Sequence, residues 1–129
     1  MGITATKPLN GKKSSLKEQP ETLSIDGALE PGKRHELEFL LELEEILKSR
    51  KKDLPKGSYT TRLFKKGIDK IAQKLGEEAV ETIIAAKNKR SEETIYESAD
   101  LVYHLLVLLV EKNLSLKDVV QEMKIRSKK

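Results

Sequence analysis

Residues 74–111 read KLGEEAVETIIAAKNKRSEETIYESADLVYHLLVLLVE, and this stretch decides the fold. Apolar residues recur at three- and four-residue intervals on both sides of a polar break at residues 88–90. This pattern is typical of two amphipathic helices joined by a short turn. We expect the first helix over residues 68–87 and the second up to residue 112, with Ser91 as its N-cap. Helices joined by so short a turn pack as an antiparallel hairpin, which predicts an all-α domain.

Four carboxylates form two pairs on these helices, Glu78 with Glu81 and Glu97 with Asp100. The members of each pair are three residues apart and therefore share one face of a helix. Both pairs are centred about 9.5 residues from Lys89, or about 14 Å along a helix axis, so a hairpin places them at one height. We therefore expect all four carboxylates to face one groove.

The surroundings of these carboxylates suggest a metal site. Residues 101–110 are apolar on nearly every side, as in a helix that is buried on most of its faces. Carboxylates that crowd together away from water repel one another unless protons or cations neutralise them. Ligation by oxygen atoms alone favours Mg²⁺, with Mn²⁺ as a possible substitute, over Zn²⁺. The alternative interpretation is that these acids form ordinary solvated helix faces.

The same apolar segment carries one polar residue, His104, on the stripe that also contains Asp100. A lone histidine on an apolar helix is often a packed, hydrogen-bonded residue, and a contact to substrate or to a site carboxylate is the other possibility. The segment has more apolar surface than a monomer of 129 residues easily covers, which favours self-association.

Basic side chains lie on both sides of the predicted groove. Lys74 is one turn before Glu78, and Lys87 ends the same helix. Further basic residues lie on or just after the loop at residues 55–60: Lys56, Arg62, Lys65 and Lys66. Such cations can hold phosphate groups, although each one can equally be a solvated surface residue.

The rest of the chain predicts shorter helices. Over residues 35–52 the apolar residues lie mainly on one side and the charged residues on the other, which predicts an amphipathic helix. A helix or helical turn is expected around residues 62–66. Ser115 and Asp118 resemble a capping box for a last helix that ends near residue 125. The predicted fold is therefore a bundle of four to five helices, completed by homodimerisation.

The domain boundaries follow from composition. Residues 1–33 are rich in Lys, Ser, Thr, Gly and Pro and lack a helical period, which predicts a flexible N-terminal extension. The all-α domain is expected over residues 34–125, and a basic tail over residues 126–129.

Composition also excludes several classes of protein. The chain has no Cys, so disulfides and thiolate metal sites are excluded, and a reducing cytoplasm is the expected location. The net charge of +4 comes from residues 112–129, which carry six basic and two acidic side chains, whereas residues 34–111 carry fourteen and fifteen. We therefore expect no nucleic-acid partner, and no apolar run approaches the ~20 residues that span a bilayer.

The acidic spacing resembles a known signature. Glu78-x-x-Glu81, fifteen residues and then Glu97-x-x-Asp100 is similar to the motif of the all-α nucleoside triphosphate pyrophosphatases, which include MazG and the dimeric dUTPases. Four segments, in this order, resemble the phosphoribosyl-ATP pyrophosphatases of histidine biosynthesis more narrowly: residues 57–60 (GSYT), 74–79 (KLGEEA), 85–88 (AAKN) and 99–109 (ADLVYHLLVLL).

The resemblance implies hydrolysis of the α,β-phosphoanhydride of phosphoribosyl-ATP to phosphoribosyl-AMP and pyrophosphate by metal-activated water, in a homodimer. It assigns metal binding and catalysis to the four paired carboxylates. Ser58, Lys74, Lys87 and His104 would contact the nucleotide, and Glu77 would support the metal ligands or act as a base. The alternatives are a house-cleaning nucleoside triphosphate pyrophosphatase that uses the same metals and a non-catalytic helical dimerisation module.

Overall fold

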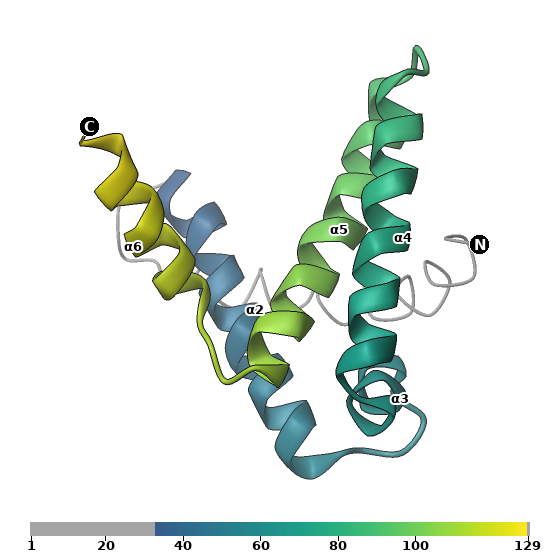
Figure 1. Ribbon diagram of the computed structural model, residues 1–129, viewed down its shortest axis with the longest axis vertical. Helices are drawn as coiled ribbons and strands as arrows, with labels where there is room; N and C mark the ends of the chain where they lie inside the picture. The colour runs from purple at the N-terminus through teal and green to yellow at the C-terminus, as the bar shows by residue number, and fades with distance from the viewer. Residues whose placement is uncertain (1–32, 129) are drawn as a thin grey trace.

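The computed structural model describes residues 33–128, which form five α-helices and, over that range, no strand. The predicted all-α class is therefore confirmed (Figure 1). The helices are α2 (Lys33–Asp53), α3 (Tyr59–Lys66), α4 (Ile68–Ala86), α5 (Ser91–Glu111) and α6 (Leu116–Ser127). None of these described helices combines the length and apolar character that crossing a membrane requires. The predicted extension lies outside the described residues, except for Lys33, at which α2 begins.

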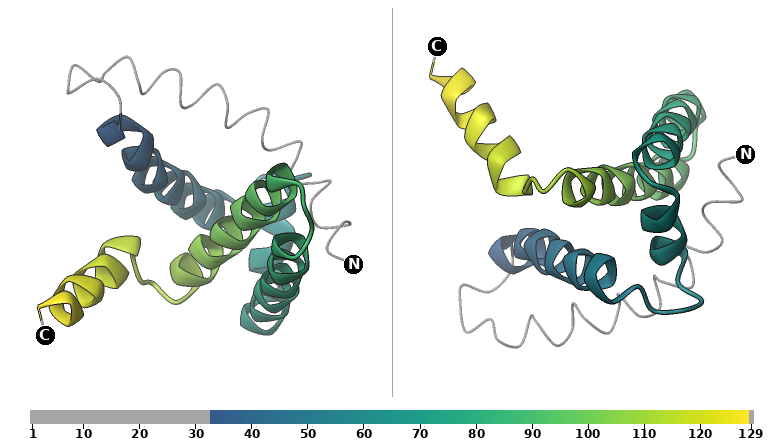
Figure 2. Two further views of the ribbon diagram at one scale, coloured as in Figure 1. Left: turned by 90° about the horizontal axis from the view of Figure 1, so that it is seen from above. Right: turned by 60° about the horizontal axis from the view of Figure 1, so that its bottom comes forward.

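Helices α4 and α5 form the predicted hairpin, which is the most extensive helix pair of the described residues, and α2 and α3 cover one end of it (Figures 1 and 2). The core lies where α5 meets α2 and α3, and Leu106, Val107 and Ile71 are fully buried there. Because the C-terminal half of α5 supplies most of this core, its N-terminal half and the facing part of α4 extend beyond it. The carboxylates lie near the boundary between the two parts.

The start of α3 differs from the prediction. The helix begins at Tyr59, three residues earlier than expected, because Ser58 caps it by accepting a hydrogen bond from the Thr61 amide at 3.2 Å. It ends at Gly67, whose φ of +90° turns the chain directly into α4. A residue with a side chain is strained at this angle, so glycine suits the joint.

The start of α5 also differs from the prediction. Ser91 is the first residue of the helix and not its N-cap, because the extended residue before it, Arg90, accepts the first helical hydrogen bond from Glu93 at 3.2 Å. No side-chain hydrogen bond caps this end of the helix. The negative charges of Glu92 and Glu93 in the first turn compensate in part by facing the positive end of the helix dipole.

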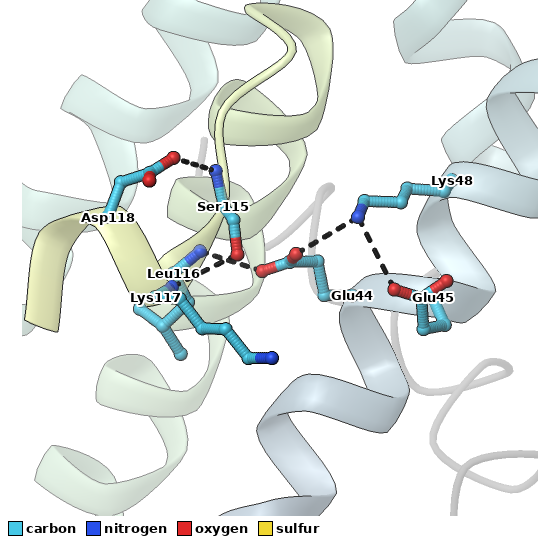
Figure 3. A network of polar contacts seen from close by, with 7 residues as sticks. All are labelled: Glu44, Glu45, Lys48, Ser115, Leu116, Lys117 and Asp118. Carbon is cyan, nitrogen blue, oxygen red and sulfur yellow. Dashed lines mark hydrogen bonds and ion pairs between the residues drawn. The ribbon is translucent and has the colours of Figure 1, made fainter.

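Helix α6 is attached by a polar network (Figure 3). Asn113, at a φ of +60°, ends α5, and the predicted capping box of Ser115 and Asp118 starts α6. Glu44 of α2 accepts a hydrogen bond from the Leu116 amide at 2.7 Å, so a buried carboxylate on one helix caps another. Beyond this anchor α6 runs away from the other helices (Figure 2) and continues to Ser127, so Arg126 and Ser127 of the predicted tail are helical.

Candidate metal centre

Three of the four paired carboxylates meet between α4 and α5. One oxygen from each of Glu78, Glu97 and Asp100 lies within 4.8 Å of the other two. Glu78 and Asp100 are buried, with 0% and 1% of their surface exposed, and Glu97 is half-buried. The hairpin therefore brings Glu78 level with Glu97 and Asp100, as the spacing from the turn predicted for these three residues.

Glu81 is the fourth predicted ligand, and it lies outside this set of three. It is half-buried one turn closer to the interhelical turn, and its negative charge helps to raise the pKa of both Glu97 and Glu78. Glu81 is therefore a close neighbour of the cluster, and its place as a ligand stays a prediction.

Burial and mutual repulsion raise the pKa of two of the clustered carboxylates. Burial, followed by the negative charge of Asp100, raises the pKa of Glu78 to about 7, although the Lys74 ammonium opposes this. Burial and the charge of Glu81 also raise the pKa of Glu97, against the effect of hydrogen bonding with Glu78. These causes are the desolvation and like-charge repulsion that the sequence implied.

The donor set fits a hard divalent cation. When ionised, neither carboxylate oxygen of Glu78 has a hydrogen-bond donor within the described part of the chain, and both oxygens are buried. One oxygen of Glu97 is in the same situation. Buried oxygens of this kind cost free energy unless a proton or cation meets them, and oxygen ligands suit Mg²⁺ and Mn²⁺. The geometry thus supports the predicted metal site.

Lys74 and Glu77 form a pair beside the cluster. Lys74 is buried, and its ammonium lies 2.9 Å from a Glu77 carboxylate oxygen, which puts the lysine charge next to Glu78. Hydrogen bonds from Gln73 and then from Lys74 lower the pKa of Glu77. Glu77 is therefore outside the set of three clustered carboxylates and holds the lysine beside them.

His104 is fully buried and hydrogen-bonded through both ring nitrogens. Nδ1 lies 2.8 Å from the carbonyl oxygen of Asp100, which can only accept, so Nδ1 carries a hydrogen. In the neutral ring Nε2 is then an acceptor, and the Tyr59 hydroxyl donates to it at 2.9 Å. The next residue along α3, Thr60, hydrogen-bonds Tyr103. This is the packed histidine that the sequence allowed, and its predicted substrate contact stays a prediction.

The other two predicted nucleotide contacts are Ser58 and Lys87. Ser58 is half-buried at the start of α3, and its side-chain oxygen accepts a hydrogen bond from the Thr61 amide. Lys87 is exposed at the C-terminal end of α4, about 14 Å along the helix axis from Glu78. The structure does not bring Lys87 to the carboxylates.

A pocket of about 350 Å³ opens beside the cluster, toward the turn of the hairpin. Glu81 and Glu97 line its inner end, and Ile84 and Tyr96 contribute apolar and aromatic surface. The sequence did not point to Tyr96, and it included Tyr59 only as part of the resembling segment 57–60, without a role. Tyr59 and His104 are 45 residues apart, so no local spacing in the sequence indicates that their side chains hydrogen-bond.

Comparison with known proteins agrees with this geometry. Residues 40–127, which include every clustered carboxylate, match the sequence model of the family described as phosphoribosyl-ATP pyrophosphohydrolase. The chain is 53% identical to the phosphoribosyl-ATP pyrophosphatase of Leptospira biflexa over 90 residues, which are 70% of this chain and 98% of the relative. It is 55% identical to the phosphoribosyl-ATP pyrophosphatase of Lactiplantibacillus plantarum over 82 residues, 64% of this chain and 77% of the relative.

A longer kind of relative matches over part of its length. The chain is 51% identical over 106 residues to the histidine biosynthesis bifunctional protein HisIE of Caldanaerobacter subterraneus subsp. tengcongensis. The match covers 82% of this chain and 50% of that protein, so the chain spans about half the length of the bifunctional relative. The family match and the near-complete coverage of the Leptospira relative establish that this chain belongs to the phosphoribosyl-ATP pyrophosphohydrolase family.

Proposed function

We propose that this chain hydrolyses the α,β-phosphoanhydride of phosphoribosyl-ATP, giving phosphoribosyl-AMP and pyrophosphate, as a step of histidine biosynthesis. The observation that carries the proposal is the buried cluster of Glu78, Glu97 and Asp100 within the family-matched region. In this reaction a water oxygen bonds to the α-phosphorus while the bond from that phosphorus to the bridging oxygen breaks. The electron pair leaves with pyrophosphate, and no protein nucleophile is required.

We place a divalent cation, Mg²⁺ with Mn²⁺ as a substitute, on Glu78, Glu97 and Asp100, with Glu81 as the nearest additional ligand. Bound there, the cation would supply Lewis-acid polarisation of the phosphoanhydride and activation of water. Glu78 must be ionised to act as a ligand, and the Lys74 ammonium favours this form. Glu77 fixes the position of Lys74 through their 2.9 Å ion pair, and it therefore acts on the carboxylate cluster only through Lys74.

The nucleoside is placed in the 350 Å³ pocket between the outer parts of α4 and α5. Tyr96 adds an aromatic ring that suits a base, and Asn88 and Arg90, which contact Glu93 and Glu92, lie at the outer rim. Glu81 and Glu97 belong both to this pocket and to the cluster region. A nucleotide bound in the pocket therefore has its phosphate chain directed toward the carboxylates.

We also propose that the chain acts as a homodimer in the cytoplasm. Large apolar side chains remain exposed on the outer part of the hairpin, including Val80, Ile83 and Ile84 on α4 and Ile95 on α5, all at least half exposed. A second copy would bury this face and cover the pocket that Ile84 lines. Sedimentation analysis should give a dimer, and Ile83→Glu should yield a monomer with less activity.

Pyrophosphate release from phosphoribosyl-ATP and from a panel of ordinary nucleoside triphosphates, with Mg²⁺ and with EDTA, tests the substrate. Metal-dependent release from phosphoribosyl-ATP alone is the expected result. Release from a different nucleotide would retain the carboxylate chemistry and reject the histidine pathway. No release from any nucleotide would favour a non-catalytic helical module.

A further inference from the structure

The phosphate groups of the proposed substrate carry several negative charges, and two of the cations predicted for them, Lys74 and Lys87, are not well placed. Lys74 is buried and already paired with Glu77, and Lys87 is at the end of α4, about 14 Å along the helix axis from Glu78. A cation that reaches the terminal phosphates would therefore have to come from the end of the site where α3 meets the hairpin.

Arg62 on α3 provides such a cation. Its guanidinium carbon lies 5.8 Å from the centroid of the Tyr59 ring, over the ring, in a cation–π arrangement. The side chain is exposed, and it takes part in none of the ion pairs found over the described range. Its five N–H donors therefore remain open to an anion.

The ring under Arg62 is fixed beside the cluster. The Tyr59 hydroxyl donates to His104, and His104 donates to the carbonyl oxygen of Asp100. The rings of Tyr59 and His104 also meet edge to face, with centroids 5.8 Å apart. The hydroxyl end of the ring is therefore held at His104, while Arg62 covers the ring's face.

The features of the site lie in one order along the hairpin. The pocket with Tyr96 is nearest to the turn, the carboxylates of Glu78 and Asp100 follow, and Tyr59 with His104 lies nearest to α3. A nucleoside triphosphate chain is linear, so a nucleoside in the pocket and an α-phosphate at the carboxylates leave the β- and γ-phosphates on the α3 side. These two phosphates are the departing pyrophosphate.

We propose that Arg62, held against the ring of Tyr59, binds the departing pyrophosphate and so fixes the direction in which the substrate lies along the α4–α5 hairpin. The inference rests on the proposed phosphoanhydride hydrolysis and adds a binding residue and an orientation to it. A guanidinium suits this role because it can bind two phosphate oxygens at once.

Calorimetric titration of the full chain with inorganic pyrophosphate, in Mg²⁺ and in EDTA, tests the binding without turnover. Arg62→Ala should weaken pyrophosphate binding about tenfold or more, as expected for loss of a charge-assisted hydrogen-bonding group. Arg62→Lys should retain part of the affinity. Arg126→Ala, which removes an exposed arginine from α6, is the matched control and should bind like the unmodified chain. Equal affinity in Arg62→Ala and the control would overturn the proposal.

Product inhibition tests the orientation. Arg62→Ala should weaken inhibition by pyrophosphate and leave inhibition by phosphoribosyl-AMP unchanged within about twofold. Equal weakening of both products would overturn the orientation, because it would mean that Arg62 supports the whole site. If the unmodified chain binds pyrophosphate in an Arg62-dependent manner but does not hydrolyse phosphoribosyl-ATP, the proposed substrate fails and the pyrophosphate site stands.

Discussion

Glu78 of α4 and Asp100 of α5 face each other across the hairpin with carboxylate oxygens within 4.8 Å, and neither side chain is exposed to water by more than 1%. Two negative charges at this separation disfavour each other, and burial adds to the cost. The raised pKa of Glu78, about 7, is the consequence. At neutral pH the pair therefore requires either a retained proton or a cation, and this requirement leads to measurable effects.

The metal-free protein should lose stability as pH rises. Glu78 has a pKa of about 7 in the folded chain and 4.5 in the unfolded chain, so the folded state holds the proton more tightly between these values. Its contribution is fully present below pH 4.5 and is lost as pH rises through about 7. Thermal unfolding in EDTA from pH 5 to pH 8 should show this decline. Glu78→Gln should flatten the decline, and an unchanged slope in that variant would contradict the account.

Mg²⁺ should reverse the effect. Because a cation on the cluster neutralises the carboxylates without a proton, added Mg²⁺ should raise the melting temperature more at pH 8 than at pH 5. A Mg²⁺ effect that does not depend on pH, or one that persists in Asp100→Asn, would place the cation elsewhere.

Lys74 should control how readily Glu78 ionises and therefore how much Mg²⁺ the chain requires. Its ammonium lowers the pKa of Glu78, so Lys74→Met should raise that pKa and disfavour the ionised ligand. Half-maximal activity at pH 7 should then require about three- to tenfold more Mg²⁺, and the requirement should ease at higher pH. A loss of activity that neither Mg²⁺ nor pH restores would show that Lys74 acts in another way.

Glu44 should give the opposite pH dependence. Burial alone would raise its pKa, but hydrogen bonds from the Leu116 amide, Ser115 and Lys48 hold it below 4.5. Its contribution is therefore present above pH 4.5 and is lost as pH falls below that value.

Glu44→Ala should lower the free energy of unfolding by about 1–3 kcal/mol, because the Leu116 amide at the start of α6 loses its partner. The neighbouring Glu45 is exposed, and in the described part of the chain its ion pair is with Lys48. Glu45→Ala should therefore lower the free energy of unfolding by less than about 0.5 kcal/mol. Chemical denaturation of both variants at pH 7 makes the comparison. Equal losses would contradict the capping role of Glu44.

Tyr59→Phe distinguishes the role of the Tyr59 hydroxyl in stability from the role of its ring in pyrophosphate binding. The variant removes the donor to His104 Nε2 and should lower the free energy of unfolding by about 1–3 kcal/mol. The ring under Arg62 remains, so pyrophosphate affinity should change little, whereas Tyr59→Leu should weaken it. If both variants bind pyrophosphate equally well, the ring does not position Arg62.

The sequence predicted the hairpin and the carboxylate cluster because both depend on local spacing. Helical period places Glu78 and Asp100 on facing surfaces, and a short turn between the helices fixes their height. The capping box at Ser115 could be predicted for the same reason, since its two residues are three apart.

Features that depend on contacts between distant segments could not be predicted in this way. The hydrogen bond from Tyr59 to His104 and the Glu44 cap on α6 join residues 45 and 72 positions apart. The N-cap of α5 was misplaced by one residue because propensity favours serine there, whereas the backbone of Arg90 already begins the helix. Lys87 was expected at the site because of its motif, but its position at the end of α4 places it a long way from Glu78.

The most direct test of the central claim is pyrophosphate release from phosphoribosyl-ATP by four proteins: the unmodified chain, Glu78→Gln, Asp100→Asn and, as a control on α6, Glu122→Gln. With saturating Mg²⁺ the unmodified chain and the control should release pyrophosphate at the same rate, and EDTA should abolish release. Each cluster variant should be slower by more than about a hundredfold, the effect of losing a cation that contributes several kcal/mol. Full Mg²⁺-dependent activity in Glu78→Gln and Asp100→Asn would contradict a catalytic metal between α4 and α5.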